Sequence, residues 1–204
     1  MADLHICPIV EGHGEYEAAR PLLERAWREI IGGTNVNVLR PIRQPRGKLV
    51  KETELTRALT LAAEKLLVIP EDGATRLVIV LIDAEEDLPC ELAPRLWKTI
   101  SAACRPGVAY SCVLANVMYE TWFVAAAESL TDFLDLAEGE PPTDPERQRC
   151  GKTWIKKRMR RAKYSETLDQ PAMTARMDMN AARARAASFD KLCRELEAFK
   201  PERW

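Results

Sequence analysis

LVIVLI, residues 77–82, is apolar at every position and is followed directly by Asp83. A strand that is apolar on both faces has to be covered on both faces, as in a parallel sheet flanked by helices. A strand with one face in water would alternate apolar and polar residues instead. This segment therefore predicts a buried strand of an α/β fold.

The segments before and after this strand alternate between predicted strands and predicted helices. Apolar runs over 4–10, 36–42 and 108–114 predict three more strands, and apolar residues at helical spacing predict helices over 16–31, 53–67, 90–104 and 118–130. Pro21 predicts a kink in the first helix or a helix start close to it. The alternating order predicts a parallel sheet of about four strands flanked by helices.

The pattern changes beyond residue 131. Residues 138–146 (EGEPPTDPE) predict a linker, 152–164 (KTWIKKRMRRAKY) a basic helix, 165–173 (SETLDQPAM) an irregular segment and 188–199 a closing helix. We therefore expect an α/β domain over residues 1–131 and a helical C-terminal extension over 132–204 that packs on it.

Composition argues against several classes of protein. A hydrophobic content of 47% and balanced charges (30 Lys and Arg, 31 Asp and Glu) argue against disorder of the whole chain. No run approaches the roughly 18 apolar residues of a membrane helix, so no membrane partner is expected. The first residues lack the basic region of a signal peptide, and the six cysteines never form C-x-x-C. These features predict a cytoplasmic protein with reduced cysteines.

The C-terminal part is basic although the whole chain is nearly neutral. Residues 151–204 carry 14 basic and 7 acidic residues, whereas residues 1–150 carry 16 and 24. A helix with many cations and no acid can follow a nucleic-acid backbone. A solvated helix face, or one docked on the acidic part of the chain, is the alternative. The candidate nucleic-acid contacts are Lys156, Lys157, Arg160 and Lys163.

Acidic residues follow two of the predicted strands directly. Glu11 and Glu15 come after strand 4–10, and Asp83, Glu85 and Asp87 come after strand 77–82. If the two strands are neighbours, their ends lie about 5 Å apart at the edge where ligands of such sheets bind. Crowded carboxylates repel unless a cation holds them, and Mg²⁺ or Mn²⁺ prefers such oxygen ligands. The joint placement favours a metal site over two solvated acidic loops.

These two motifs resemble the signatures of Toprim (topoisomerase–primase) domains. VEGHGEYEAARPLL (10–23) resembles the first, a hydrophobic strand, Glu-Gly, a second Glu and a helix, and VLIDAEED (80–87) resembles the second, a strand followed by Asp-x-Asp. The chain is most similar to small bacterial Toprim-like proteins of unknown function related to OLD-type nucleases. The shared features include an acid-x-Trp pair like Glu120-x-Trp122 and the tail motif YSETLDQPAM (164–173) followed by SFDKL (188–192).

The resemblance implies a Toprim/Rossmann-like sheet and a Mg²⁺-dependent hydrolase that cleaves phosphodiester bonds. Glu11 matches the Toprim glutamate, a metal ligand or general base, Asp83 matches the first acid of Asp-x-Asp, and Glu15 matches the additional acid of the OLD-like version. The second acid is Glu85 rather than Asp, and its extra methylene moves the carboxylate. Glu86 or Asp87 is the alternative ligand at this place.

We therefore expect a nuclease in which Glu11, Asp83 and Glu15 are catalytic and Glu85 and Asp87 complete the Mg²⁺ or Mn²⁺ site. Two interpretations of Glu120 stay open: a further site acid, or an ordinary helix N-terminal acid that interacts with the dipole.

The rival hypothesis, also taken from the resembling group, is a non-catalytic or partner-dependent Toprim-fold subunit that works with an ATPase in bacterial defence. The near-zero net charge and Glu85 favour this rival. Gly151-Lys152-Thr153 does not predict an ATP site in this chain, because Glu146 stands where a Walker A motif needs glycine and no strand precedes it.

Overall fold

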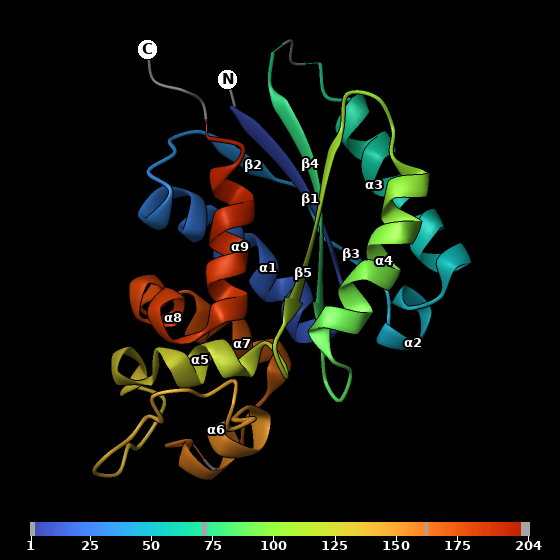
Figure 1. Ribbon diagram of the computed structural model, residues 1–204. Helices are drawn as coiled ribbons and strands as arrows, with labels where there is room; N and C mark the ends of the chain where they lie inside the picture. Colours follow the sequence, from blue (N-terminus) through green and yellow to red (C-terminus); the bar gives the residue numbers. More distant parts are fainter. Residues whose placement is uncertain (1–2, 71–72, 162, 201–204) are drawn as a thin grey trace.

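The computed structural model describes residues 3–70, 73–161 and 163–200. Within them, one sheet of five parallel strands has the order β2-β1-β4-β5, and β3 also pairs with β1 (Figure 1). This confirms the α/β fold class, with five strands in place of about four. The strands are β1 (Leu4–Val10), β2 (Val36–Val38), β3 (Ile42–Arg43), β4 (Thr75–Asp83) and β5 (Ala109–Ala115).

The segment predicted as one strand over 36–42 forms the two short strands β2 and β3. Ile6 of β1 is opposite Val38, and Ile9 is opposite Ile42. The segment from β2 to β3 therefore contains one residue more than β1 does between these two pairings. Pro41 lies in this interval and has no N–H to donate to a ladder. The ladder along β1 is therefore interrupted there and resumes at Ile42.

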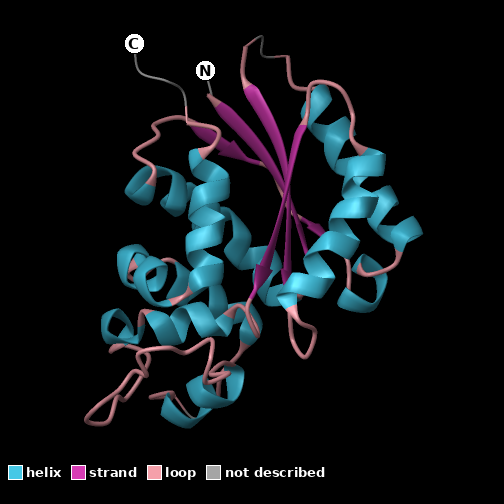
Figure 2. Ribbon diagram, in the orientation of Figure 1, coloured by secondary structure: helices cyan, strands magenta, loops and turns pink. Residues whose placement is uncertain are grey.

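Helices cover both faces of the sheet (Figure 2). On one face lie α2 (Arg46–Leu49), α3 (Glu52–Leu67) and α4 (Pro89–Ala103), and on the other lie α1 (His13–Arg25) and α9 (Ala187–Glu197). The side chains of β4 alternate between the two layers: Leu77, Ile79 and Leu81 pack on the side of α1 and α9, and Val78, Val80 and Ile82 on the side of α3 and α4. The uniform apolarity of 77–82 thus reflects burial on both faces.

The first helix starts earlier than predicted. α1 begins at His13, well before Pro21, and continues into a π-helical turn over Ala26–Ile30. Pro21 lies inside α1, so the alternative in which the helix starts close to the proline is wrong. The early start places Glu15 in the first turn of α1, beside the carboxyl end of β1.

The C-terminal part is more helical than its sequence suggests. The prediction of an irregular segment over 165–173 is wrong, because these residues form most of α7 (Glu166–Thr174), which packs along α1. Burial of Met173 and Thr174 outweighs the weak helical propensity of a segment that contains Pro171. The other elements here are α5 (Glu120–Ala125), the 3₁₀ turn Ala127–Leu130, α6 (Lys152–Arg158) and α8 (Met179–Arg185), of which α8 was not predicted.

The basic helix is shorter than predicted, and α6 ends at Arg158. Met159 is extended and bridges Leu134, and the Arg160 N–H donates to the Phe133 carbonyl at 2.8 Å. The backbone beyond Arg158 is therefore held by this bridge instead of continuing the helix. Ala162, within the predicted helix, lies outside the described residues.

An aromatic cluster joins α5 to the segments around it. The Trp122 ring lies 4.9 Å from the Tyr119 ring and 5.2 Å from the Phe189 ring of α9, measured between centroids. The Trp122 indole N–H donates to Ser188 Oγ at 2.8 Å. Residues from both sides of position 131 thus share one hydrophobic core. No helix in the described ranges is long and apolar enough to cross a membrane.

Candidate active site: a buried carboxylate cluster

Four acidic side chains lie at the carboxyl edge of the sheet, here named the carboxylate cluster: Glu11, Glu15, Asp83 and Glu120. Glu11 directly follows β1, Asp83 ends β4, Glu15 is in the first turn of α1, and Glu120 begins α5. Because β1 and β4 pair in parallel, with Val10 opposite Leu81, their carboxyl ends meet at one edge. Burial is extensive, with Glu120, Glu15 and Asp83 only 1%, 7% and 9% exposed.

Burial and nearby negative charges disfavour the charged forms of Glu11, Asp83 and Glu120. Burial raises the pKa of Glu11 to about 7, with a further upward contribution from Glu15, while Arg46 opposes the shift. Burial, followed by the charges of Glu11, Glu15 and Glu120, raises the pKa of Asp83 well above its ordinary value. Burial also raises the pKa of Glu120, against the lowering effect of Lys152. A cluster of this kind retains protons near neutral pH unless a cation compensates the charge.

Each glutamate of the carboxylate cluster has one buried oxygen that accepts no hydrogen bond from the described residues: Oε2 of Glu11, of Glu15 and of Glu120. The other oxygen is held in two of them, where Glu15 Oε1 accepts from Gln170 Nε2 at 3.2 Å and Glu120 Oε1 accepts from the Tyr164 hydroxyl at 3.0 Å. Buried polar atoms are normally paired, so three unpaired oxygens at one edge need an explanation. Carboxylate oxygens are the donor type that a hard cation such as Mg²⁺ prefers.

Two glycines allow this close packing. A Cβ on Gly12 would overlap Glu15 Oε2, and a Cβ on Gly14 would overlap Gln170 Oε1. Only glycine therefore fits at these positions with the acid and the amide where they are. The Gly-x-Gly sequence around His13 serves the approach of Glu15 and Gln170, and His13 itself is exposed.

Arg46, at the start of α2, binds the loop that follows β4. Its guanidinium donates to the Asp83 and Ala84 carbonyls, the latter at 3.0 Å, and pairs with Glu85 at 3.1 Å and with Asp87. The nearest contact between Arg46 and Glu11 Oε2 is 3.9 Å. Sequence analysis missed Arg46; the available signal was a basic loop, RQPRGK, after a strand that ends at the same edge.

The predicted ligands Glu85 and Asp87 do not join the buried set. Their side chains are 53% and 48% exposed and are engaged by Arg46, although the charge of Glu85 still acts on Glu11. In the described part of the chain, no three His, Cys, Asp or Glu side chains are assembled as a group that could hold a metal ion. The donor types nevertheless fit Mg²⁺, which commonly takes only one or two carboxylates and completes its shell with waters and substrate phosphates.

Backbone strain is concentrated beside the cluster. Among the described residues, the non-glycine residues with positive φ are Glu85 (51°), Val117 (66°) and Arg149 (51°). They are linked in series, since the Glu85 N–H donates to the Val117 carbonyl at 2.7 Å and Arg149 Nη2 donates to the Glu85 carbonyl at 3.0 Å. Left-handed geometry is unusual for a β-branched residue, and such strain concentrates at functional sites.

The tail motif supplies the partners of the buried acids. Tyr164 and Gln170 bind Glu120 and Glu15, and the Lys152 ammonium lies 3.9 Å from Glu120 and 2.8 Å from Glu166. The sequence indicated this motif only by resemblance, because contacts across 155 residues (Gln170 to Glu15) and 44 residues (Tyr164 to Glu120) leave no local pattern. Glu120 is buried in the carboxylate cluster, and it is also the first residue of α5, so both positions considered for it in the sequence are occupied.

The predicted nucleic-acid contacts are dispersed. Lys156 and Lys163 are exposed, Lys157 is exposed at the rim of a pocket, and Arg160 pairs with Asp135 at 2.9 Å and donates to the Thr131 carbonyl. Lys163 and Arg160 lie beyond the end of α6. The four cations therefore do not form one helical face.

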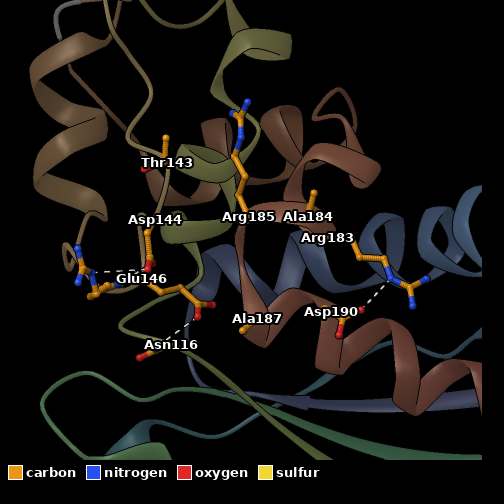
Figure 3. Close-up of a pocket in the computed structure, with 10 residues that line it drawn as sticks. Asn116, Thr143, Asp144, Glu146, Arg183, Ala184, Arg185, Ala187 and Asp190 are labelled. Carbon is orange, nitrogen blue, oxygen red and sulfur yellow. Dashed lines mark hydrogen bonds and ion pairs between the residues drawn. The ribbon is translucent and has the colours of Figure 1, made fainter.

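A cavity of about 670 Å³ lies on the α9 side of β5 (Figure 3). Its charged side chains are satisfied locally: Arg147 pairs with Asp144, Arg183 pairs with Asp190, and Glu146 accepts from Asn116 (Figure 3). Buried Glu146 also accepts from the Ser188 N–H at 2.9 Å and from its hydroxyl at 2.5 Å. This network fixes the start of α9 against the loop after β5.

Replacing Glu146 with Ala is expected to lower the free energy of unfolding by about 2–3 kcal/mol, because the buried donors of Ser188 and the half-buried amide of Asn116 lose their acceptor. Urea unfolding measures this change, and Asp144→Ala is the control, because its acid is half exposed. Equal free energies of unfolding for the two variants would show that the hydrogen bonds of Glu146 do not stabilise the fold.

Comparison with known proteins gives one match. No curated protein and no solved structure matches the chain. A protein-family model described as "Domain of unknown function (DUF4276)" matches residues 10–197, a range that contains all four acids of the carboxylate cluster. Since this match covers most of its length, the chain belongs to the DUF4276 family.

Proposed function

We propose that this protein is a metal-dependent phosphodiesterase of the Toprim type that cleaves nucleic acid at the carboxylate cluster. The observation that carries the proposal is the set of three buried glutamate oxygens without hydrogen bonds, placed where β1 and β4 end. The raised pKa values of Glu11 and Asp83 support it, because shifts of this kind gather at functional sites.

Each residue has a distinct part in this proposal. Glu11 and Asp83 hold Mg²⁺ or Mn²⁺, with Glu15 and Glu120 supporting, and the cation when bound would acidify water and neutralise charge on the phosphate. In the metal-free protein burial raises the pKa of Glu11 to about 7, which would suit it to accept a proton near neutral pH, the general-base role that is the alternative to metal ligation. Gln170 and Tyr164 fix one oxygen of Glu15 and of Glu120, which leaves the other oxygen free to bind.

A second candidate is a subunit that becomes active only with a partner, such as an ATPase. The contacts of Arg46 favour it, because this side chain holds Glu85 and Asp87 while no group of three ligands is assembled in the described residues. In this version, partner binding moves the loop after β4 and releases the acids.

The deciding experiment incubates the purified protein with circular and linear DNA and with RNA, in Mg²⁺, Mn²⁺ or EDTA. Glu11→Gln controls for contaminating nuclease, and Glu17→Gln, an exposed glutamate of α1, is the matched control. Cleavage that needs metal, persists in Glu17→Gln and disappears in Glu11→Gln supports the enzyme. Equal cleavage by all three proteins identifies a contaminant.

If no cleavage is seen, either the protein is a partner-dependent subunit or both candidates are wrong. Thermal denaturation separates these two cases. A cation that binds only the folded state raises the melting temperature. A Mn²⁺-dependent rise that is lost in Glu11→Gln supports the partner-dependent subunit, whereas no rise at saturating metal contradicts both candidates.

A further inference from the structure

A pocket of about 360 Å³ lies between the loop after β5 and the first turns of α6. Among the described residues that line it, four are cations and none is Asp or Glu. We name it the basic pocket; its polar and charged walls are Arg149, Lys152, Thr153, Lys157 and Arg158.

The basic pocket shares a wall with the carboxylate cluster. A Cβ on Gly151 would meet Met118 Sδ at 2.6 Å, and the Lys152 N–H donates to this sulfur at 3.2 Å, so the start of α6 is packed tightly on Met118. The next residue, Tyr119, donates its N–H to Asp83 Oδ1 at 2.8 Å. Lys152 belongs to both places, because it lines the pocket and its ammonium is 3.9 Å from Glu120.

The charges of the basic pocket are unequally compensated. Arg149 pairs with Glu86 at 2.9 Å, Lys152 with Glu166 at 2.8 Å, and Arg158 with Glu140. The Arg158 guanidinium also stacks on the Trp154 ring, 4.0 Å from its centroid. Within the described ranges Lys157 has no ion pair and the Thr153 hydroxyl no hydrogen bond, so both are available to an anion.

We propose that the basic pocket binds a backbone phosphate of the nucleic-acid substrate, next to the phosphate that is cleaved at the carboxylate cluster. This inference rests on the proposed function and adds the place where the strand is held. Lys157 supplies the uncompensated charge, Thr153 supplies a hydroxyl donor, and Lys152 lines the side toward the carboxylate cluster, 3.9 Å from Glu120. Such contacts position a strand without selecting its sequence.

The test measures binding without catalysis. A fluorescein-labelled oligonucleotide is titrated with protein in EDTA at several salt concentrations, and the anisotropy gives Kd. We expect Lys157→Glu to weaken binding by about tenfold and to lower the slope of log Kd against log salt by about one, as the loss of one phosphate contact would. Lys98→Glu, an exposed charge reversal on α4, is expected to leave Kd unchanged.

Lys156→Glu separates the basic pocket from a generally basic helix. Lys156 is the neighbour of Lys157 on α6 and is also exposed, but it does not line the pocket. The basic pocket predicts a clearly smaller loss for Lys156→Glu, and equal losses for both variants would overturn the proposal. An unchanged Kd in Lys157→Glu would also overturn it.

A failure of the basic pocket and a failure of the proposed function give different results. Binding is measured in EDTA, where metal-dependent cleavage does not occur, so the Lys157→Glu titration does not depend on catalysis at Asp83. If Asp83→Asn keeps its cleavage activity, the proposed function fails while the Lys157 result stands. If cleavage requires Asp83 but Lys157→Glu binds normally, only the basic pocket fails.

Discussion

Asp83→Asn is expected to abolish metal-dependent cleavage and, in EDTA at pH 8, to raise the melting temperature. The substitution keeps the shape of the side chain and an oxygen that can accept from the Tyr119 N–H. It removes a buried charge that lies among three other acids and whose pKa is raised well above its ordinary value by burial and by their charges. We expect a loss of activity of more than about 100-fold, since even outer partners of metal ligands cost about 10–100-fold when mutated.

The stability part of this prediction has a definite pH dependence. A group whose pKa is raised on folding binds its proton more tightly in the folded state, so its contribution to stability falls as pH rises from the unfolded pKa through the folded one. For Glu11 this interval runs from 4.5 to about 7, which corresponds to a loss of at most about 3 kcal/mol across it. Asp83 acts in the same direction.

Thermal denaturation in EDTA at pH 5 and pH 8 measures this effect alongside the cleavage assay. The wild type is expected to lose more stability between the two pH values than Asp83→Asn does, and Asp87→Asn, half exposed, is the control. Lower stability of Asp83→Asn at pH 8 would mean that the acid is already compensated in the folded protein. The carboxylate cluster would then need no cation.

Much of the fold follows from local pattern. Uniform apolarity over 77–82 predicted a strand buried on both faces, and the acids after β1 and β4 were expected at one edge because parallel strands end together. These predictions depend on short segments and on a general property of parallel sheets. Their success required no knowledge of distant contacts.

The missed features depend on contacts between distant segments. Gln170 reaches Glu15 across 155 positions, and Tyr164 reaches Glu120 across 44. α7 was predicted as irregular because its own residues favour helix weakly, whereas packing on α1 determines its structure. The predicted ligands Glu85 and Asp87 face Arg46, from a loop whose path the sequence does not give.

Arg46→Met is expected to destabilise the metal-free protein and to strengthen its response to metal. The guanidinium is surrounded by oxygens of Glu11, Glu85 and Asp87 and by the Asp83 and Ala84 carbonyls, so it serves as an internal counter-ion of this edge. Removing it leaves these acids without compensation and raises the pKa of Glu11 further, because Arg46 lowers it in the wild type. We expect a loss of about 2–3 kcal/mol in EDTA at pH 8, less than for a fully buried pair because two partners are half exposed.

Mn²⁺ is then expected to raise the melting temperature of Arg46→Met more than that of the wild type, because the cation no longer competes with a guanidinium for the acids. Arg43→Met, an exposed arginine of β3, is the matched control and should respond as the wild type does. A smaller response in Arg46→Met would show that Arg46 helps to build the cation site by holding the loop after β4. A larger Mn²⁺-dependent rise in the melting temperature would show that the Arg46 guanidinium takes the place of the metal at this edge. A partner that activates the carboxylate cluster would then have to displace Arg46.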